Sequence, residues 1–397
     1  MTASVPHRVG LYLAVVQFFF TITWTVYVIF LPRLAAEAGI PKQTVIFILM
    51  MDQLIFACMD LAMGVMADRV SRVVGRLGYI VLGVTLLSCL AFLLLPLAAP
   101  SGAAWLFIAL TVLWSASSSV LRAPPLMMLG KYAARPALPW LSALSLFGLG
   151  AAGAVSPYLT VALRDADPRM PFALSSIALA LATLGVVWVE RRLAANPAPA
   201  ATPSVAAAKP VHPLFWFLFG VVLLAIGFQV HFAMNSAPLY LRFAKPADLE
   251  YLMPVFWIGF NLLMLPATLA TQRYGGLAVM GAGGVAGALA VYLAAGAGSL
   301  NVLIAMQFIA GGAWGCVLMS AVAAALVIGH TGREGKVTGT LFSLLALATF
   351  ARMAVVAAQL NKDPGFAALL GWMPVALWAL AGALLLLLVP MQRRAAA

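Results

Sequence analysis

Long apolar stretches dominate this sequence of 397 residues. A helix needs roughly 20 apolar residues to cross the hydrocarbon core of a bilayer, and the sequence holds twelve such stretches. Because a spanning segment must satisfy its backbone polar groups internally, they predict an all-α polytopic membrane protein with twelve transmembrane helices. The predicted spans are 11–31, 44–64, 77–97, 104–130, 138–162, 171–190, 214–238, 252–271, 277–297, 300–328, 337–360 and 364–390.

A stretch rich in Ala and Pro, residues 191–213, separates the sixth span from the seventh. This composition is typical of a flexible linker. The sequence therefore predicts two six-helix domains, 1–190 and 214–397, joined by a cytoplasmic linker. The first apolar run, 11–31, is too long for the core of a signal peptide and has no A-x-A exit before Pro32, so we expect it to remain as a spanning helix.

The composition excludes several classes of protein. Hydrophobic residues make up 64% of the chain and charged residues only 9%, whereas soluble chains are near 45–50% apolar and about 25% charged. A cytosolic enzyme, a disordered protein and a nucleic-acid binder are therefore excluded. The three cysteines, Cys58, Cys89 and Cys316, all lie in apolar stretches, so neither a disulfide framework nor a CxxC metal site is expected.

The basic residues predict the orientation of the chain. They outnumber the acidic residues 23 to 11, and 14 of the 23 lie in loops on one side of the predicted spans, against seven on the other. Loops rich in Lys and Arg stay in the cytoplasm. We therefore expect both termini to be cytoplasmic, in a bacterial-type inner membrane, and the basic excess requires no nucleic acid as a partner.

The loop between the second and third spans carries a recognisable motif. It reads Gly64-Val-Met-Ala-Asp68-Arg69-Val-Ser71-Arg72, which resembles the G-x-x-x-D-R-x-G-R loop of the major facilitator superfamily, with Ser71 in place of the usual Gly. In that family the loop is implied to latch the two halves in one conformation. The alternative is a charge cluster that only fixes orientation, although such a cluster does not need Asp68.

A degenerate second copy of this loop lies 204 residues further on. It runs from Thr268 to Gly276, between the eighth and ninth spans, and keeps the arginine as Arg273 while Gln272 replaces the aspartate. A similar loop at the same place in each half is the expected trace of a duplicated six-helix bundle.

The resemblance implies a fold of two pseudo-symmetric six-helix bundles and a secondary transporter working by alternating access. It implies a monomer among membrane lipids that moves a small-molecule substrate, with protons as the coupling ion and no cofactor. The ATP-binding motif GxxxxGK[ST] is absent from the sequence. An enzyme is not expected, because only two carboxylates on one helix, Asp52 and Asp60, favour it. A transporter-like receptor without flux stays open, as does the direction of transport.

Five ionisable residues lie inside predicted spans, where charge is costly and usually functional. They are Asp52, Asp60, Arg122, His231 and Arg352. At 1.5 Å per residue, Asp60 and Arg122 lie roughly 24 and 27 Å from the outer side, so they can pair. In the family, an Arg on the fourth helix belongs to a motif for proton or substrate handling; the alternative is a structural ion pair.

Asp52 and Arg352 form a second hypothetical pair. Asp52 lies roughly 12 Å from the outer face, near the midplane, and Arg352 is roughly 22 Å into its span from inside. Burial of a carboxyl favours its protonated form, as proton coupling requires. We hypothesise that the two residues approach one another across the seam between the halves and close the outer side. Alternatively, Arg352 binds an anionic substrate or backbone carbonyls.

Polar and aromatic side chains near the midplane are the candidates for substrate binding. The first and seventh spans line the cavity in this family, and the eighth adds Trp257 and Asn261. A central cavity between these belts is the predicted site. Its predicted residues are Gln17, Thr21, Trp24, Gln229, His231, Asn235, Trp257 and Asn261. A lone helix histidine such as His231 is more often a polar core residue than a ligand.

A copper importer is the alternative function. Thioether and imidazole groups together suit Cu(I), and His231, Met234 and Met264 offer them. The arrangement only loosely resembles the Met and His pairs on helices seven and eight of bacterial copper importers in the superfamily. Met-rich packing of membrane helices explains the same residues without a metal.

Overall fold

The computed structural model describes residues 7–70, 76–132, 135–195, 211–329 and 332–396, which are helical and contain no strand. Twelve helices in these ranges are long and apolar enough to cross a membrane. Each predicted span overlaps one of them, which confirms the prediction of an all-α polytopic membrane protein.

The first six spans are built from seven helices. The fourth span is divided, because Arg122 precedes Ala123 and two prolines, and a residue before proline disfavours the helical conformation; α4 ends at Ser118 and α5 begins at Pro124. The helices are α1 (His7–Glu37), α2 (Val45–Val70), α3 (Arg76–Ala98), α4 (Ala104–Ser118), α5 (Pro124–Tyr132), α6 (Leu138–Ala162) and α7 (Arg169–Ala195).

The last six spans begin with α8. A π-helical turn, His231–Asn235, joins α8 to the short α9 within the seventh span. The helices are α8 (Val211–Val230), α9 (Ser236–Tyr240), α10 (Leu249–Leu252), α11 (Pro254–Tyr274), α12 (Gly276–Ala295), α13 (Leu300–Ile328), α14 (Glu334–Ala357) and α15 (Pro364–Ala396). Of the predicted linker, 191–213, residues 196–210 lie outside the described residues, and α7 continues as far as Ala195.

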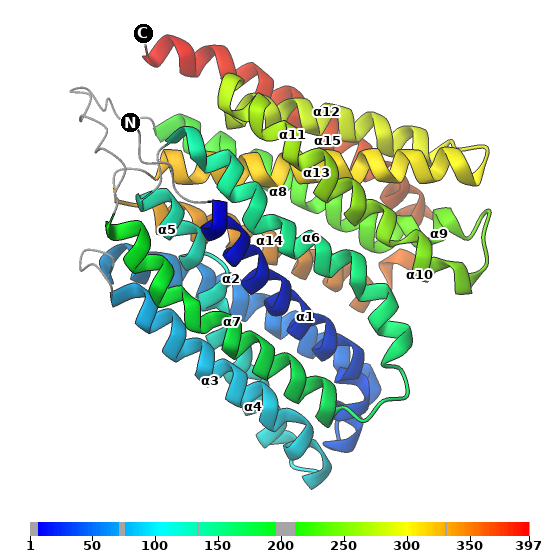
Figure 1. Ribbon diagram of the computed structural model, residues 1–397. Coiled ribbons are helices and arrows are strands. Elements are labelled where there is room, and N and C mark those ends of the chain that lie inside the picture. Colours follow the sequence, from blue (N-terminus) through cyan, green and yellow to red (C-terminus); the bar gives the residue numbers. More distant parts are fainter. Residues whose placement is uncertain (1–6, 71–75, 133–134, 196–210, 330–331, 397) are drawn as a thin grey trace.

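The helices pack as two groups, the first half (α1–α7) and the second half (α8–α15) (Figure 1). In the first half α1 packs on α6 and α7, and α3 on α4 and α7. In the second half α12 packs on α13 and α15, and α8 on α15. The start of α1 and the end of α15 lie at the same end of the molecule, here called the terminal face.

Two helix pairs make the most extensive contacts between the halves. The first seam is the contact of α2 with α14, and the second seam is the contact of α6 with α11. The first seam is backbone against backbone: a methyl group added to Gly64 would overlap the carbonyl oxygen of Gly335, and one added to Gly339 would overlap that of Asp60. Small residues permit such close helix contact in membranes.

A carboxylate closes the first seam at the terminal face. Asp68, near the end of α2, accepts hydrogen bonds from the backbone N–H groups of Gly335 (2.7 Å) and Lys336 (2.8 Å) at the start of α14. The first N–H groups of a helix have no intrahelical partner and favour an anion. Asp68 therefore caps a helix of the opposite half. Arg69 is exposed beside it, and Arg72 lies outside the described residues.

Substituting Gly64 by Ala should separate the halves at the terminal face, because the added methyl group has no room against Gly335. Overpacking costs about 1–3 kcal/mol, which shifts a two-state equilibrium by roughly 5- to 150-fold. Spin labels at positions Arg69 and Arg333, in a cysteine-free background, should report longer distances. Gly83→Ala is the matched control, since its methyl group meets nothing within 4 Å. Equal distance distributions for the two variants would contradict this prediction.

Candidate functional site

The carboxylate of Asp52 is held inside the first half. Its side chain is fully buried on α2. One oxygen accepts a hydrogen bond from the hydroxyl of Tyr27 on α1 (2.8 Å) and the other from Ser115 on α4 (2.6 Å). Tyr27 packs in turn against Trp114, with ring centroids 4.5 Å apart. Asp52 thus has two neutral donors and an aromatic surround.

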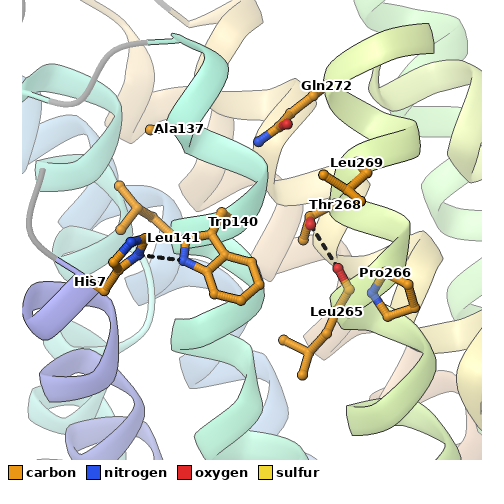
Figure 2. A pocket seen from close by; sticks show the side chains of 9 residues that line it. All are labelled: His7, Ala137, Trp140, Leu141, Leu265, Pro266, Thr268, Leu269 and Gln272. Atoms are coloured by element: carbon orange, nitrogen blue, oxygen red, sulfur yellow. Dashed lines mark hydrogen bonds between the residues drawn. The ribbon is translucent and has the colours of Figure 1, made fainter. Parts of the chain in front are cut away.

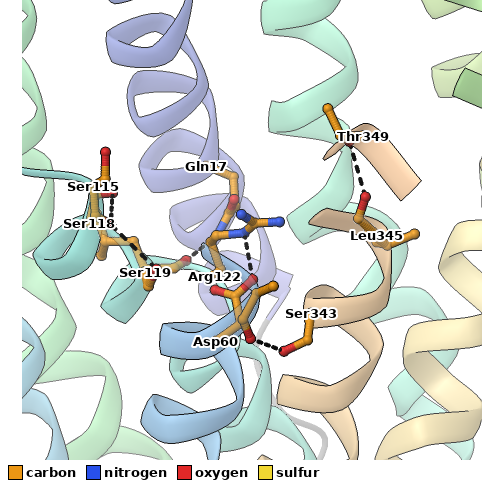
Figure 3. A network of polar contacts seen from close by, with 11 residues as sticks. Gln17, Asp60, Ser115, Ser118, Ser119, Arg122, Ser343, Leu345 and Thr349 are labelled. Atoms are coloured by element: carbon orange, nitrogen blue, oxygen red, sulfur yellow. Dashed lines mark hydrogen bonds and ion pairs between the residues drawn. The ribbon is translucent and has the colours of Figure 1, made fainter. Parts of the chain in front are cut away.

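Asp60 and Arg122 form the expected pair. The Nε atom of Arg122 lies 3.3 Å from a carboxylate oxygen of Asp60, whose side chain is fully buried (Figure 3). The two opposite charges at this distance form an ion pair, and neither carboxylate oxygen has a hydrogen-bond partner among the described residues. Arg122 lies at the break between α4 and α5, and from there its guanidinium contacts residues of α2.

Arg122 also lies between the halves. Its guanidinium carbon is 4.9 Å from the ring centroid of Phe56 on α2 and 5.6 Å from that of Phe342 on α14. Cation–π contacts of this kind are favourable when the cation is desolvated. Next to Phe342 on α14, Ser343 donates to the carbonyl of Ala57 at 2.5 Å. The ion pair is therefore built into the first seam.

The predicted residues of α1 have different surroundings. Gln17 donates from its amide to the carbonyl of Leu121 at 2.7 Å, and Thr21 donates to the carbonyl of Gln17 at 2.8 Å. Both polar groups are thus directed to backbone. Trp24 is partly buried and packs against the cluster of Phe56, Ala57 and Ala346, which crosses the first seam. Of the three, Trp24 is the residue placed where the halves meet.

Arg352 contacts its own half. Its Nε atom donates to the side-chain oxygen of Gln229 on α8 at 3.0 Å, and the amide nitrogen of Gln229 donates to Thr349 at 2.8 Å. The expected pair of Asp52 with Arg352 is not present among the ion pairs of the described residues. Both residues lie on the seam helices, but Asp52 faces α1 and α4 whereas Arg352 faces α8.

His231 is enclosed in the second half. It begins the π-helical turn, is fully buried, and its Nε2 atom lies 3.0 Å from the side-chain oxygen of Gln307 on α13. Its Nδ1 atom has no hydrogen-bond partner among the described residues. Asn235, at the end of the same turn, donates to the carbonyl of Leu370 on α15 at 3.0 Å. Single π-turns are frequent at functional sites.

Trp257 and Asn261 belong to the second seam. A methyl group on Gly153 of α6 would overlap the ring of Trp257. The amide of Asn261, oriented by its neighbours, donates to the carbonyl of Phe147 (3.2 Å) and accepts from the N–H of Ala151 (3.0 Å). Both side chains therefore hold α11 against α6, where the sequence predicted substrate contacts.

The three residues of the alternative copper site, His231, Met234 and Met264, do not lie together. His231 packs beside Phe256, with ring centroids 6.3 Å apart, while Met264 is buried eight residues further along α11. That separation is about 12 Å along a helix axis. Met234 lies with His231 on the π-helical turn. The structure thus keeps Met264 away from the other two.

Comparison of the halves shows where the acids lie. The repeated loop relates the two halves by a shift of 204 residues. With this shift, every acidic residue of α2 corresponds to an uncharged residue of α11. The pairs are Asp52 with Phe256, Asp60 with Met264, and Asp68 with Gln272. Tyr27, which binds Asp52, corresponds to His231. The two halves share a backbone plan, but the buried carboxylates of Asp52 and Asp60 have no acidic counterpart on α11.

Several residues that contact the predicted set were not predicted as part of it, among them Ser115, Gln307, Phe342 and Thr349. Two had a visible signal. Ser115 starts a serine-rich run in an apolar span, and Gln307 is an isolated amide in another. Phe342 and Thr349 had none, because aromatic and hydroxyl groups are ordinary in membrane helices.

Removing the charge of Asp60 should destabilise the fold, because it leaves Arg122 partly buried without its carboxylate. Breaking a buried pair costs about 3–5 kcal/mol. Asp60→Asn should lower the free energy of unfolding, measured in detergent, and the double variant with Arg122→Gln should recover much of it. Glu37→Gln breaks the exposed Arg33–Glu37 pair and serves as control, with about 0–1 kcal/mol expected. Equal losses for Asp60→Asn and Glu37→Gln would refute the prediction.

Known structures share this architecture. The fold matches the human organic anion transporter MFSD10 (TETRAN) with a TM-score of 0.72 at 16% identity, over 96% of this chain and 100% of that one. It matches a bacterial homologue of the iron transporter ferroportin, in an outward-facing state, with a TM-score of 0.73 at 13% identity, over 95% and 98%. It matches the transporter FucP, in the outward conformation, with a TM-score of 0.66 at 12% identity, over 95% and 97%.

These likenesses show the fold alone, and a search of curated proteins gave no match. The sequence itself matches the Major Facilitator Superfamily over residues 13–351, most of the chain. The family and the fold point to a secondary transporter rather than an enzyme. The twelve spanning helices, the motif that includes Asp68 near the end of α2, and this match agree, and the chain belongs to the Major Facilitator Superfamily.

Proposed function

We propose that this protein is a proton-coupled secondary transporter of a small anionic solute. The surroundings of Arg352 favour an anion as the solute. This cation lies in the membrane-spanning core, and its described contact is a neutral group, the amide oxygen of Gln229. Arg122, by contrast, has the carboxylate of Asp60. A cation in the membrane interior is costly unless it is paired, and an anionic solute supplies the charge.

The position of Arg352 supports this assignment. Ala346, on the same helix, packs with Trp24 and Phe56 where the first seam is closed. Arg352 is six residues further from the terminal face, about 9 Å along the axis, and is partly exposed. A guanidinium there can bind a carboxylate or phosphate with two parallel hydrogen bonds. The human protein of similar fold is an organic anion transporter, which agrees with this class of solute.

Asp52 is the proposed proton carrier. Its charge, when present, is fully buried and is balanced by two hydroxyl donors, while no cation of the described residues lies within 4 Å. Such a charge is offset either by a cation or by a proton. Tyr27 and Ser115 can rotate their hydroxyl hydrogens to serve either form of the carboxyl. Asp60 already has a cation and is assigned to the first seam.

We further propose that the terminal face is cytoplasmic, in a bacterial-type inner membrane, because the loops on that side carry the larger share of Lys and Arg. The segments 1–190 and 214–397 then move as two domains around the cytoplasmic linker 191–213. In that scheme Asp68 and Gly64 latch the inner side, and the protein works as a monomer.

Arg352→Gln should weaken stabilisation of the protein by the solute. The screen measures the unfolding temperature of purified protein with small mono- and dicarboxylates, phosphate esters, amino acids, sugars and metal ions. We expect an organic anion to stabilise the protein and Arg352→Gln to weaken its binding roughly tenfold or more, as loss of a charged hydrogen bond does. Arg169→Gln, an exposed charge at the start of α7, is the control. Stabilisation by a neutral or cationic compound that Arg352→Gln leaves intact would overturn the proposal.

Asp52→Asn should uncouple transport from protons, because Asn keeps the size of the side chain but cannot bind a proton. In proteoliposomes the variant should still exchange the stabilising anion across the membrane, yet an imposed proton gradient should no longer drive its accumulation. Asp363→Asn, at an exposed position outside the spans, should behave like the unmodified protein. Accumulation that responds normally to the gradient in Asp52→Asn would contradict the coupling role, and absence of any flux in the unmodified protein would favour a receptor.

A further inference from the structure

The second seam lacks the two features that close the first. Where Asp68 stands on α2, Gln272 stands on α11 and carries no charge. The second residue of α14 is Gly335, whose N–H binds Asp68, but the second residue of α6 is Pro139, which has no N–H to donate. A capped, backbone-to-backbone contact of the first kind therefore cannot form here.

A hollow is found at this place instead. It has a volume of about 510 Å³ and lies between α6 and α11, next to the start of α1 (Figure 2). A second hollow of about 370 Å³ adjoins it through the shared residue Gln272. The lining of the first hollow includes His7 of α1, Trp140 and Leu141 of α6, and Leu265, Leu269 and Gln272 of α11. None of these residues belongs to the predicted substrate site.

The lining offers little to a polar ligand. The hydroxyl of Thr268 donates to the carbonyl of Leu265 at 2.7 Å, and the indole N–H of Trp140 donates to the Nδ1 atom of His7 at 2.8 Å, as the dashed lines in Figure 2 show. These polar groups are thus directed to each other or to backbone. The remaining wall is largely aliphatic, so burial of apolar surface is the interaction that the hollow can provide.

The hollow faces the membrane and ends near charged residues. Leu269, on its wall, is 69% exposed on a membrane-spanning helix, so the opening meets lipid. Gln272 and His7 lie at the end nearest the terminal face, where α11 ends and α1 begins. The residues that follow them in the sequence, Arg273 and Arg8, are both exposed. An apolar slot with basic residues at the membrane–water boundary matches an anionic lipid in shape and in charge.

We propose that this hollow binds one anionic phospholipid, with an acyl chain between Leu141 and Leu265 and the headgroup phosphate beside Arg8 and Arg273. The lipid contacts α1 and α6 of the first half and α11 of the second. It therefore fills the second seam at the terminal face, where the protein has no latch of its own. The proposal does not depend on which solute the protein transports.

The first test is retention of lipid by the purified full chain. Protein reconstituted with phosphatidylglycerol and then delipidated is analysed by native mass spectrometry. Leu265→Trp fills the hollow and should reduce the retained phosphatidylglycerol about tenfold, because each methylene displaced weakens binding roughly fourfold. Leu262→Trp, on the same helix but outside the hollow and 53% exposed, should retain it. Equal retention by both variants overturns the proposal.

The second test leaves the packed seam intact. Phosphatidylglycerol with brominated acyl chains should quench the fluorescence of Trp140, so Trp140→Phe should remove the tightly bound component of the quenching. Neutralising Arg8 and Arg273 together should abolish the preference for phosphatidylglycerol over phosphatidylcholine, whereas Arg169→Gln should not. Quenching that Trp140→Phe leaves unchanged, or displacement of the bound chain by the transported anion, overturns the assignment to lipid.

Discussion

The contact of Asp68 with the start of α14 is the interaction on which the arrangement of the two halves depends. It joins residues 267 positions apart through backbone groups that a helix cannot satisfy itself. With α14 held there, Gly64 and Gly339 allow the backbones to touch. Phe342 then reaches Arg122. The contact of Arg122 with Phe342 and the close packing of the first seam at the terminal face both depend on the position of α14, which this helix cap fixes.

The two halves of the fold differ in the residues at corresponding positions of α2 and α11. The first carries the buried carboxylates of α2, and the second carries Phe256, Met264 and Gln272 at the corresponding places. The same substitution explains both the enclosed aromatic core around His231 and the hollow at the second seam. Where the first half has the buried carboxyl of Asp52, the second has the buried ring of Phe256, and where the first half has the helix cap of Asp68, the second has Gln272 beside the hollow.

The sequence alone predicted the features that depend only on position along a helix axis. Twelve apolar runs located the spans, and counting 1.5 Å per residue brought Asp60 and Arg122 to the same depth, where they pair. Depth alone does not say which way a side chain points. Asp52 and Arg352 therefore lie on facing helices with separate partners, and Asn261 binds α6 rather than a cavity. The π-helical turn at His231 has no clear signature in residue type.

The close approach at Gly64 and Gly335 also limits how the halves can part. Side chains in an interface can change rotamer and maintain partial contact while two surfaces slide. Backbone atoms have no such freedom, because each carbonyl stays fixed by its own helix. Contact of this kind is made or lost as a whole, so the terminal face has few stable intermediate widths. We therefore expect the glycines to favour two arrangements of the terminal face, in contact or apart, over a continuous range of widths.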